Sequence, residues 1–578
     1  MIKTLAGCVR EYRLPAVLSP VFVSLEVIME VLIPLVMARL IDFGIDAGDM
    51  NAVMKYGMIL VLCAVLSLAF GVASSTVAST ASVGFAKNLR KDMFYNVQRF
   101  SFSNIDKFSA ASIITRLTTD VNNVQNAFMM IIRIAARCPL MLIFSVVMAL
   151  SINVEITLIF LAVMPVLALI LFGIIKIAYP MFEKIFRTYD KLNNVVRENI
   201  RGIRVVKAYV REEHEISKFK GISDKIFRDF SKAEKIVAFN APVMQLAVYT
   251  CMIGASWLGA KLIVGGSLTT GELVSIITYA IQILMSLMML SMIFVMLTMA
   301  RASAERDYEI LIEEPVIANC ENPVTEVADG SIEFRNVDFS YAGDRDKLCL
   351  SNVNLKIESG EVIGIVGGTG SSKSTLVQLI PRLYDVTGGE VLVGGVNVRD
   401  YDMHALRNSV SMVLQKNVLF SGTVNENMRW GDPEASQEDI IRACETAQAD
   451  EFVSDFPKGY ETFIDQGGTN VSGGQRQRLC IARALLKKPK IIIMDDSTSA
   501  VDTATDAKIR KAFRDDIPDT TKIIIAQRIS SVEHADKIIV LDGGKINGMG
   551  THEELLESNE IYREAYTSQM KGGMGLGE

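Results

Sequence analysis

The 578-residue sequence lacks paired cysteines and long runs of basic residues. Its eight cysteines are scattered, with no Cys-x-x-Cys pair and no spacing typical of metal ligands, so neither a disulfide framework nor a structural zinc site is expected. Such cysteines are typical of small buried residues in a reducing compartment. The net charge of −6 comes without a basic cluster, and we therefore expect no nucleic-acid partner.

Hydrophobic residues, in contrast, make up half of the chain, and the mean hydropathy of +0.31 is above what soluble enzymes of several domains usually reach. A membrane region accounts for this excess. Six apolar stretches precede residue 301, at about 14–41, 57–83, 138–151, 156–178, 237–265 and 273–300. Most reach the roughly 20 residues that a membrane-spanning helix needs. The short third stretch is expected to be the outer part of a helix that begins before Arg133.

The segments around these stretches predict the orientation of the chain. Lys3, Arg10 and Arg13 precede the first stretch, which is too long for a signal peptide and shows no clear cleavage site, so we expect a retained span. The connector 42–54 contains aspartates but no Lys or Arg, whereas residues 84–137 and 176–236 are long and rich in both. The positive-inside rule then predicts a multi-pass protein of the cytoplasmic membrane, with the long connectors and both termini in the cytoplasm.

Helical spacing of apolar residues continues through the long connectors, so we expect the helices to project beyond the membrane. Two pieces, 101–108 and 202–209, are predicted to be elbows between such helices, with a solvated loop as the alternative. Residues 306–330 gather glutamates, prolines and a glycine, which is typical of a linker. The expected domains are a membrane domain at 1–305 and a soluble α/β domain at 331–578.

The most informative stretch is 361–375, with the sequence EVIGIVGGTGSSKST. An apolar strand breaks at Gly367 into a tight loop, and a helix opens at Lys373, which is the arrangement of a phosphate-binding loop. The usual pattern G-x-x-x-x-G-K-[ST] has Ser372 at its second glycine; serine keeps the backbone N–H, and a positive φ there would cost about 1–2 kcal/mol. We expect Lys373 to reach the terminal phosphates of a nucleotide and Ser374 to ligate Mg²⁺. The candidate cofactor-binding residues here are Gly367, Gly368, Thr369, Gly370, Ser371, Ser372, Lys373, Ser374 and Thr375.

Further patterns follow in the second half of the chain. A Val-Ser-Gly-Gly-Gln segment at 471–475 precedes the predicted helix 476–486, and the apolar strand 491–494 ends in Asp495. Ala500-Val501-Asp502 begins five residues later, and Gln415 lies in a Val-Leu-Gln-Lys segment. In combination these motifs resemble the nucleotide-binding domain of ATP-binding cassette (ABC) transporters. The six apolar stretches ahead of them resemble the membrane domain of an ABC exporter of the multidrug type (type IV), so the resemblance covers nearly the whole chain.

The resemblance implies a fold and a set of roles. The expected fold is an all-α domain of six membrane helices with long intracellular extensions, fused to an α/β P-loop ATPase domain of ABC type. Ser472, Gly473, Gly474 and Gln475 correspond to the family signature, which closes on the γ-phosphate held by the opposite subunit; a simple helix cap is the structural alternative. Asp495 would hold Mg²⁺ through water, Gln415 would sense this ion as well, and Tyr341 would stack on adenine.

Two positions depart from the pattern of hydrolytic family members. Asp496 stands where those members have a glutamate that polarises the attacking water, and the lost methylene retracts the carboxylate by about 1.5 Å. Gln527 replaces the switch histidine, and an amide can neither carry a positive charge nor shuttle a proton. In addition, Asp465-Gln466 replaces the common Gly-Glu of the family's X-loop, which puts that loop's contacts in doubt.

The chain thus combines an intact signature with a phosphate-binding side that lacks the catalytic glutamate and the switch histidine. This combination resembles the degenerate-site subunit of a heterodimeric bacterial exporter. We therefore expect ATP and Mg²⁺ as cofactors, a second half-transporter as partner, and hydrolysis mainly at the composite site that both subunits form. The expected substrates are amphipathic small molecules or lipids. The alternatives are a homodimer with two slow ATP sites and an ATP-binding regulatory or scaffold protein of the membrane.

Two features of the apolar half are candidate substrate contacts. Glu26 and Glu30 lie four residues apart in the first stretch, where carboxylates are costly and commonly functional, either for a cationic substrate or with a salt-bridged partner. A polar contact between helices is the structural alternative. The last stretch carries methionines at helical spacing, which suit a cavity for varied ligands but are more often packing or lipid contacts. They are Met285, Met288, Met289, Met292, Met296 and Met299.

Overall fold

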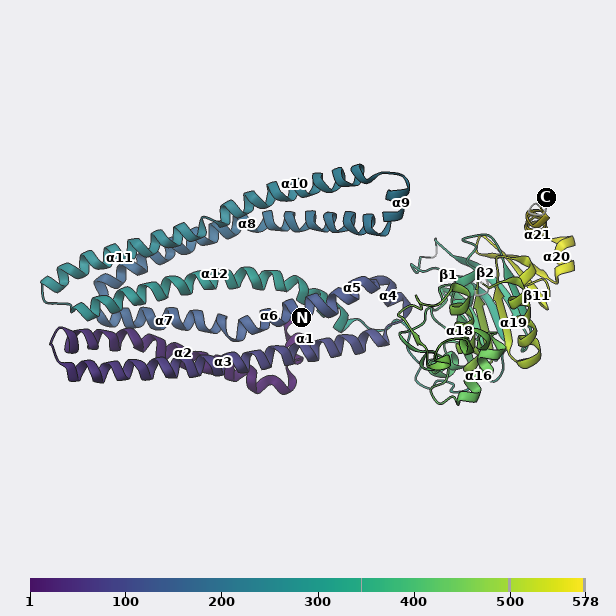
Figure 1. Cartoon of the computed structure of the whole chain (residues 1–578), viewed down its shortest axis with the longest axis horizontal. Helices are drawn as coiled ribbons and strands as arrows, with labels where there is room; N and C mark the ends of the chain where they lie inside the picture. Colours follow the sequence, from purple (N-terminus) through teal and green to yellow (C-terminus); the bar gives the residue numbers. More distant parts are fainter. Residues whose placement is uncertain (345, 497–500, 575–578) are drawn as a thin grey trace. The chain divides into compact units, whose positions relative to one another are not determined.

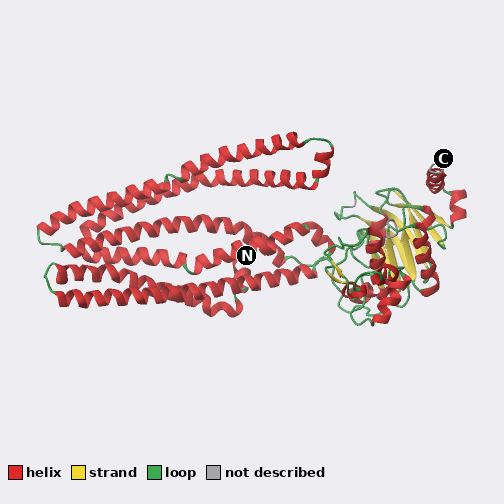
Figure 2. Ribbon diagram, viewed as in Figure 1, coloured by secondary structure: helices red, strands yellow, loops and turns green. Residues whose placement is uncertain are grey.

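The computed structural model describes residues 1–344, 346–496 and 501–574. The chain forms two units (Figure 1): one comprises Met1–Gln98 and Ala110–Glu313, and the other comprises Arg99–Ser109 and Glu314–Glu578. The first unit is helical, whereas the second combines β-sheets with covering helices (Figure 2). The predicted fold class, a six-helix membrane domain joined to an α/β ATPase domain, is confirmed.

Within the residues that the structure describes, six helical stretches are long and apolar enough to cross a membrane. They are Arg10–Ile45, Met50–Arg99, Ala110–Ile152, Val154–Arg201, Glu212–Val264 and Thr270–Ile312. Helix α3 (Met50–Arg99) has 50 residues, about 75 Å at the rise of an α-helix and more than twice the hydrocarbon thickness of a bilayer. The helices therefore continue well past their apolar segments, as their spacing predicts.

The remaining helices of this unit have the following bounds: α1 Ile2–Gly7, α2 Arg13–Leu40, α5 Ala110–Thr115, α6 Val121–Ile132, α7 Ile134–Ile152, α8 Val154–Arg201, α9 Ile203–Ala208, α10 Glu212–Val237, α11 Asn240–Val264 and α12 Thr270–Ile312. The third stretch breaks at Arg133, whose φ of −115° and ψ of −67° leave the ideal helix between α6 and α7. The short apolar segment at 138–151 is thus the outer part of a longer helical stretch.

Helix α7 packs against both α2 and α12. Val23 and Val27 of α2 form one buried cluster with Met141 of α7 and Tyr279 of α12. The Tyr279 hydroxyl donates a hydrogen bond to the carbonyl oxygen of Val31 at 2.7 Å, which satisfies a polar group inside the apolar cluster. Helices α8 and α11 pack against α12 through a second cluster.

Both predicted elbows are short helices rather than loops. Helix α4 (Phe102–Phe108) belongs to the second unit, and α9 (Ile203–Ala208) belongs to the first. Ser101 and Asn104 form a capping box at the start of α4. The Asn104 side chain then ties α4 to the chain that leaves α12: its Nδ2 donates to the Glu314 carbonyl at 3.0 Å, and its Oδ1 accepts from the Val316 amide at 3.2 Å.

The linker begins later than the composition suggests. Helix α12 continues to Ile312, so the first residues of the expected linker at 306–330 are helical. Arg306 and Arg116 explain this extension, since Arg306 pairs with Asp120 and Arg116 pairs with Glu309 on the last turns of α12. The expectation of buried cysteines is wrong at two positions, because Cys320 is exposed and Cys349 is only partly buried.

The second unit contains a six-stranded sheet in the order β12-β11-β3-β10-β9-β6, in which only the edge strand β12 runs antiparallel to its neighbour. The bounds are β3 Val362–Val366, β6 Val410–Val413, β9 Ile491–Asp495, β10 Thr521–Ile525, β11 Lys537–Asp542 and β12 Lys545–Gly550. A four-stranded antiparallel sheet is formed by β1 Ile332–Phe339, β2 Leu350–Ile357, β4 Gly388–Val393 and β5 Val396–Asn397, and a small ribbon by β7 Gly422–Thr423 and β8 Phe463–Ile464. Carboxyl ends of parallel strands share one edge of a sheet, so β3, β9 and β10 deliver their following residues to a common place.

Helices cover the sheets of this unit, as Figure 2 shows. Their bounds are α13 Lys373–Gln378, α14 Met403–Ser409, α15 Val424–Met428, α16 Gln437–Thr446, α17 Asp450–Ser454, α18 Gly473–Leu486, α19 Thr503–Asp516, α20 His552–Ser558 and α21 Glu560–Met574. Alternate residues of the central strands enter two different cores: Ile492 and Met494 pack in one, and Ile491 and Ile493 pack in the other. A strand buried on both faces explains the continuous apolar run before Asp495.

Candidate nucleotide-binding site

The loop between β3 and α13 is shaped by residues with positive φ. Gly367 has φ +154°, and a Cβ there would lie 2.2 Å from the Leu541 carbonyl oxygen, so only glycine fits. Gly370 has φ +84° and nothing within 4 Å of the place of a Cβ, which leaves that part of the loop open. Ser372 has φ +69° and ψ +25°, in the left-handed region. The serine at this position therefore carries the strain of about 1–2 kcal/mol that a glycine avoids.

Lys373, the first residue of α13, turns its ammonium group back into the loop. Its Nζ donates to the carbonyl oxygens of Gly367 and Gly368, both at 2.8 Å, and to the Ser371 hydroxyl at 3.3 Å. Burial lowers the pKa of Lys373 below its ordinary value, against the opposing pull of Asp495 and Asp496. A partly desolvated cation inside a loop of backbone amides is suited to bind phosphate oxygens.

Ser374 and Asp495 meet at the end of β9. The Ser374 hydroxyl donates to Asp495 Oδ1 at 2.9 Å, and Asp495 is only 4% exposed. Burial raises the pKa of this carboxyl group. A hydroxyl and a carboxylate at this distance, beside the phosphate loop, are oxygen ligands of the kind that Mg²⁺ prefers.

Asp496 accepts hydrogen bonds from two of the other predicted site residues. Its Oδ2 accepts from Gln527 Nε2 at 2.8 Å and from Gln415 Nε2 at 3.3 Å. The backbone is fixed as well, because Asp496 has φ +48° and its amide donates to the Ile525 carbonyl at 3.0 Å. The structure thus places both departures from the hydrolytic pattern in direct contact, with neutral amides around the carboxylate.

Tyr341 lies at the side of the loop with half of its surface exposed. Its hydroxyl is 3.1 Å from the Thr375 hydroxyl, and its ring packs edge-on against Phe339 and Tyr384. Tyr384 is a residue that the sequence analysis missed: it donates to Asp106 Oδ2 of α4 at 2.7 Å. A lone tyrosine after α13 has no local motif, so only the fold reveals that it joins Tyr341 to α4.

The signature residues start α18 as a capping box. Ser472 Oγ accepts from the Gln475 amide at 3.2 Å, and Gln475 Oε1 accepts from the Ser472 amide at 2.9 Å. Ser472 and Gly473 are exposed, so the helix N-terminus with its positive dipole end faces outward. Within the described part of the chain, no hydrogen bond joins this box to the phosphate loop.

The other predicted positions give weaker information. Asp502 caps α19 by accepting from the Thr505 amide at 2.9 Å, and Val501 is buried, whereas Ala500 lies outside the described residues. In the expected X-loop, the Asp465 amide donates to Asn470 Oδ1 at 3.0 Å. This bond rigidifies the loop by itself and does not reveal a contact across subunits.

The carboxylates of the first span are paired rather than free. Arg137 of α7 donates to Glu26 Oε1 at 2.5 Å and to Glu30 Oε2 at 2.7 Å, so the salt-bridged alternative holds in this conformation. Sequence reasoning missed Arg137, although its charge at the edge of an apolar stretch was a usable signal. The exposed methionines of α12 are Met285, Met289, Met292 and Met296, while the side chain of Met299 lies outside the description.

Comparison with known proteins agrees with this geometry. Residues 17–287 match the family described as "ABC transporter transmembrane region", and residues 350–499 match the family described as "ABC transporter". The Bacillus subtilis (strain 168) protein "Uncharacterized ABC transporter ATP-binding protein YfiB" is 37% identical over 560 residues, which cover 97% of each chain. The "ATP-dependent lipid A-core flippase" of Desulfotalea psychrophila (strain LSv54 / DSM 12343) is 33% identical over 84% of this chain and 83% of its own.

A solved structure shows the same fold. The "Structure of a bacterial Atm1-family ABC exporter with ATP bound" superposes with a TM-score of 0.83 over 96% of this chain and 99% of the other, at 24% identity. Six long apolar helices, a phosphate loop beside Asp495 and a signature helix with an exposed N-terminus thus occur together in a chain that matches such relatives over nearly its whole length. The chain therefore belongs to the ABC transporter family, as a half-transporter of the ABC exporter type that joins one membrane domain to one ATPase domain.

Proposed function

We propose that this half-transporter is the subunit with the degenerate ATP site in a heterodimeric exporter of amphipathic small molecules or lipids. The observation that carries the proposal is the hydrogen-bonded set around Asp496, in which Gln415 and Gln527 donate to the same carboxylate oxygen. A carboxylate that polarises water needs a free lone pair directed at that water. Here the side chain is one methylene short and one oxygen is engaged by two amides.

The chain's own residues are nevertheless suited to hold MgATP. Lys373 and the loop amides would bind the phosphates, Ser374 and Asp495 would hold Mg²⁺, and Tyr341 offers a ring face for the adenine. Bound Mg²⁺ neutralises phosphate charge. The neutral Gln527 would contact the γ-phosphate as a hydrogen-bond donor only, since an amide cannot transfer a proton. We therefore infer a site that binds ATP and turns it over slowly.

In this proposal the intact signature of this chain acts at the ATP site of the partner subunit. The exposed N-terminus of α18 would supply Ser472 and its following glycine amides to the phosphate bound by the second subunit. An exposed apolar surface on α9 and the two residues after it also supports a dimer: Val205, Tyr209 and Val210 are 60%, 74% and 80% exposed. Such residues on a projecting helix are typical of a surface that a partner covers.

The proposed orientation follows from charge. The ATPase domain, both termini and the long charged connectors would lie in the cytoplasm, because those connectors carry most of the Lys and Arg of the membrane half. Amphipathic or lipid substrates are supported by the membrane setting and by the flippase activity that the name of one relative states.

The test is to measure ATP hydrolysis by the chain expressed alone and together with a second half-transporter. That partner carries Glu and His at the positions equivalent to Asp496 and Gln527. We expect slow turnover alone and fast turnover for the pair. A double variant, Asp496→Glu with Gln527→His, should raise turnover of the chain alone by about 100-fold, since a 1 Å misplacement costs about that much. Fast hydrolysis by the unmodified chain alone would contradict the degenerate site, and equally slow turnover of the chain alone and of the pair would support the homodimer with two slow ATP sites.

A further inference from the structure

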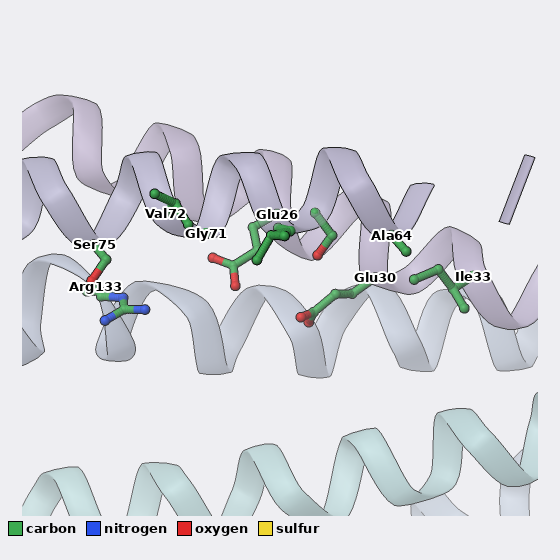
Figure 3. Close-up of a pocket in the computed structure, with 10 residues that line it drawn as sticks. Glu26, Glu30, Ile33, Ala64, Gly71, Val72, Ser75 and Arg133 are labelled. Carbon is green, nitrogen blue, oxygen red and sulfur yellow. The ribbon is translucent and has the colours of Figure 1, made fainter. Parts of the chain in front are cut away.

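A cavity of about 570 Å³ lies in the helical unit between α2 and α3. Glu26 and Glu30 line it from α2, and Arg133 lines it from the break between α6 and α7. Residues of α3 complete the wall, four of them small and the other two Leu68 and Val72. Figure 3 shows Arg133 and Ser75 at one end, Ala64 and Ile33 at the other, and the two glutamates between them. The cavity thus has a polar, charged end and an apolar end, at a volume typical of ligand pockets.

The small residues of α3 create this space. Ala64, Ser67, Gly71 and Ser75 recur every three or four positions, so they share one face of the helix. Gly71 lies beside the charges, because a Cβ there would lie 3.1 Å from Glu26 Oε1. A larger side chain on this face would occupy the cavity. The small side chains of α3 therefore leave this space open.

The charges at the cavity are only partly compensated within the protein. Arg137 engages both oxygens of Glu30 and Oε1 of Glu26. Glu26 is 7% exposed, and its Oε2 is buried without a hydrogen-bond partner. The group of three charges therefore keeps a net charge of −1 and one unused acceptor.

Arg133 is the complementary charge. Its side chain makes no hydrogen bond or ion pair within the residues that the structure describes, although it lines the same cavity. An arginine in a membrane helix is costly unless a partner or water neutralises it, and a guanidinium binds phosphate or carboxylate through two parallel hydrogen bonds. The charges of the two glutamates, Arg133 and Arg137 sum to zero. Neither a simple cation nor a simple anion therefore complements the site.

We infer that this cavity binds a zwitterionic amphiphile, with its anionic group at Arg133, its ammonium group near Glu26 and Glu30, and its apolar tail toward Ile33. This inference rests on the proposed export of amphipathic molecules and names their class. The shared chemistry is a phosphate or carboxylate joined to an amine, as in phospholipid headgroups and in soluble zwitterions. Phospholipids carry an apolar tail and soluble zwitterions do not, so probes with and without a tail distinguish these two sources.

The test uses the full-length chain in its dimer, reconstituted in phosphatidylglycerol nanodiscs without nucleotide. Four probes are compared: dodecylphosphocholine, dodecyltrimethylammonium, dodecyl phosphate and tail-free glycerophosphocholine. We expect dodecylphosphocholine to bind about tenfold or more tightly than the cation and the anion, which corresponds to one lost charged contact. It should also bind more tightly than glycerophosphocholine, which keeps both charges but buries no apolar tail. Equal or tighter binding of the cation would overturn the inference, and equal binding of glycerophosphocholine would overturn the amphiphile class.

Two variants locate the site. Arg133→Ala should remove the preference for dodecylphosphocholine over the cation, while Arg187→Ala, at an exposed arginine of α8, should leave it unchanged. Ser67→Phe should weaken binding by filling the cavity without changing a charge. Unchanged dodecylphosphocholine binding in both Arg133→Ala and Ser67→Phe would contradict the inference. Because no ATP is present, these results do not depend on which subunit hydrolyses ATP.

Discussion

The two surfaces that this chain offers to ATP differ in how completely they are built. The phosphate-loop side departs from the hydrolytic pattern at three positions: Ser372 is strained in the left-handed region, and Asp496 and Gln527 bind each other. The signature side has an intact capping box at an exposed helix N-terminus. In the proposed dimer the two surfaces would belong to different composite sites, so one could lose catalytic groups while the other is retained. The difference therefore predicts unequal roles for them.

The largest effect is expected at the signature. Ser472→Arg in the heterodimer should lower ATPase turnover by about 100-fold or more, because the helix N-terminus would no longer stabilise charge on the partner's phosphate. Steady-state phosphate release measures this. Ser454→Arg, the same change at an exposed position of α17, is the control and should have little effect. Near-normal turnover of Ser472→Arg would remove the proposed role of α18.

The next effect concerns binding at the phosphate loop. Lys373→Ala should weaken ATP affinity at this chain's site by about 10- to 100-fold, since a charge-assisted contact is worth roughly 1.5–3 kcal/mol. Titration with ATP under non-hydrolysing conditions measures it, and Lys511→Ala on the exposed face of α19 is the control. If affinity stays the same, the loop does not hold the phosphates.

A smaller effect is expected where the nucleotide side meets α4. Tyr384→Phe keeps the ring against Tyr341 but removes the hydrogen bond to Asp106. One neutral-to-charged hydrogen bond is worth about 1.5–3 kcal/mol at most. We expect substrate-stimulated ATPase activity to fall several-fold while ATP affinity is kept. Loss of affinity with normal stimulation would show that Tyr384 supports the adenine site only.

The backbone strain at Ser372 predicts that its removal will stabilise the protein. Ser372→Gly should stabilise the protein by about 1 kcal/mol, because glycine adopts a φ of +69° without a steric penalty. Thermal unfolding in the presence and absence of ATP measures it. A lower melting temperature for Ser372→Gly would mean that the serine side chain makes a compensating contact.

The sequence was most informative where function depends on residues that are adjacent in the chain. The phosphate loop, the strand before Asp495 and the box from Ser472 to Gln475 are local motifs, and β3, β9 and α18 begin or end beside them as their patterns predict. The strain at Ser372 was recognisable too, since the motif calls for glycine at that position. The contact between Asp496 and Gln527 needed the fold, because it depends on β9 and β10 lying side by side.

The membrane half was less predictable for a physical reason. Apolar stretches locate helices, but the pairing of Glu26 and Glu30 with Arg137 depends on which helix faces which. No local pattern encodes that choice when all faces of a helix are apolar. The end of α12 was missed for a similar reason, since Arg306 in its last turns pairs with Asp120, which is distant in the sequence.

The central claim is that the two surfaces are unequal, and one comparison tests it directly. Steady-state ATPase activity should be measured for Ser472→Arg and Asp496→Asn, each in the purified heterodimer with an unmodified partner. We predict a loss of about 100-fold for the first and less than about threefold for the second, because Asp496 is already retracted and bound by two amides. Equal and severe losses from both variants would show that Asp496 is a working catalytic base, which would contradict the account.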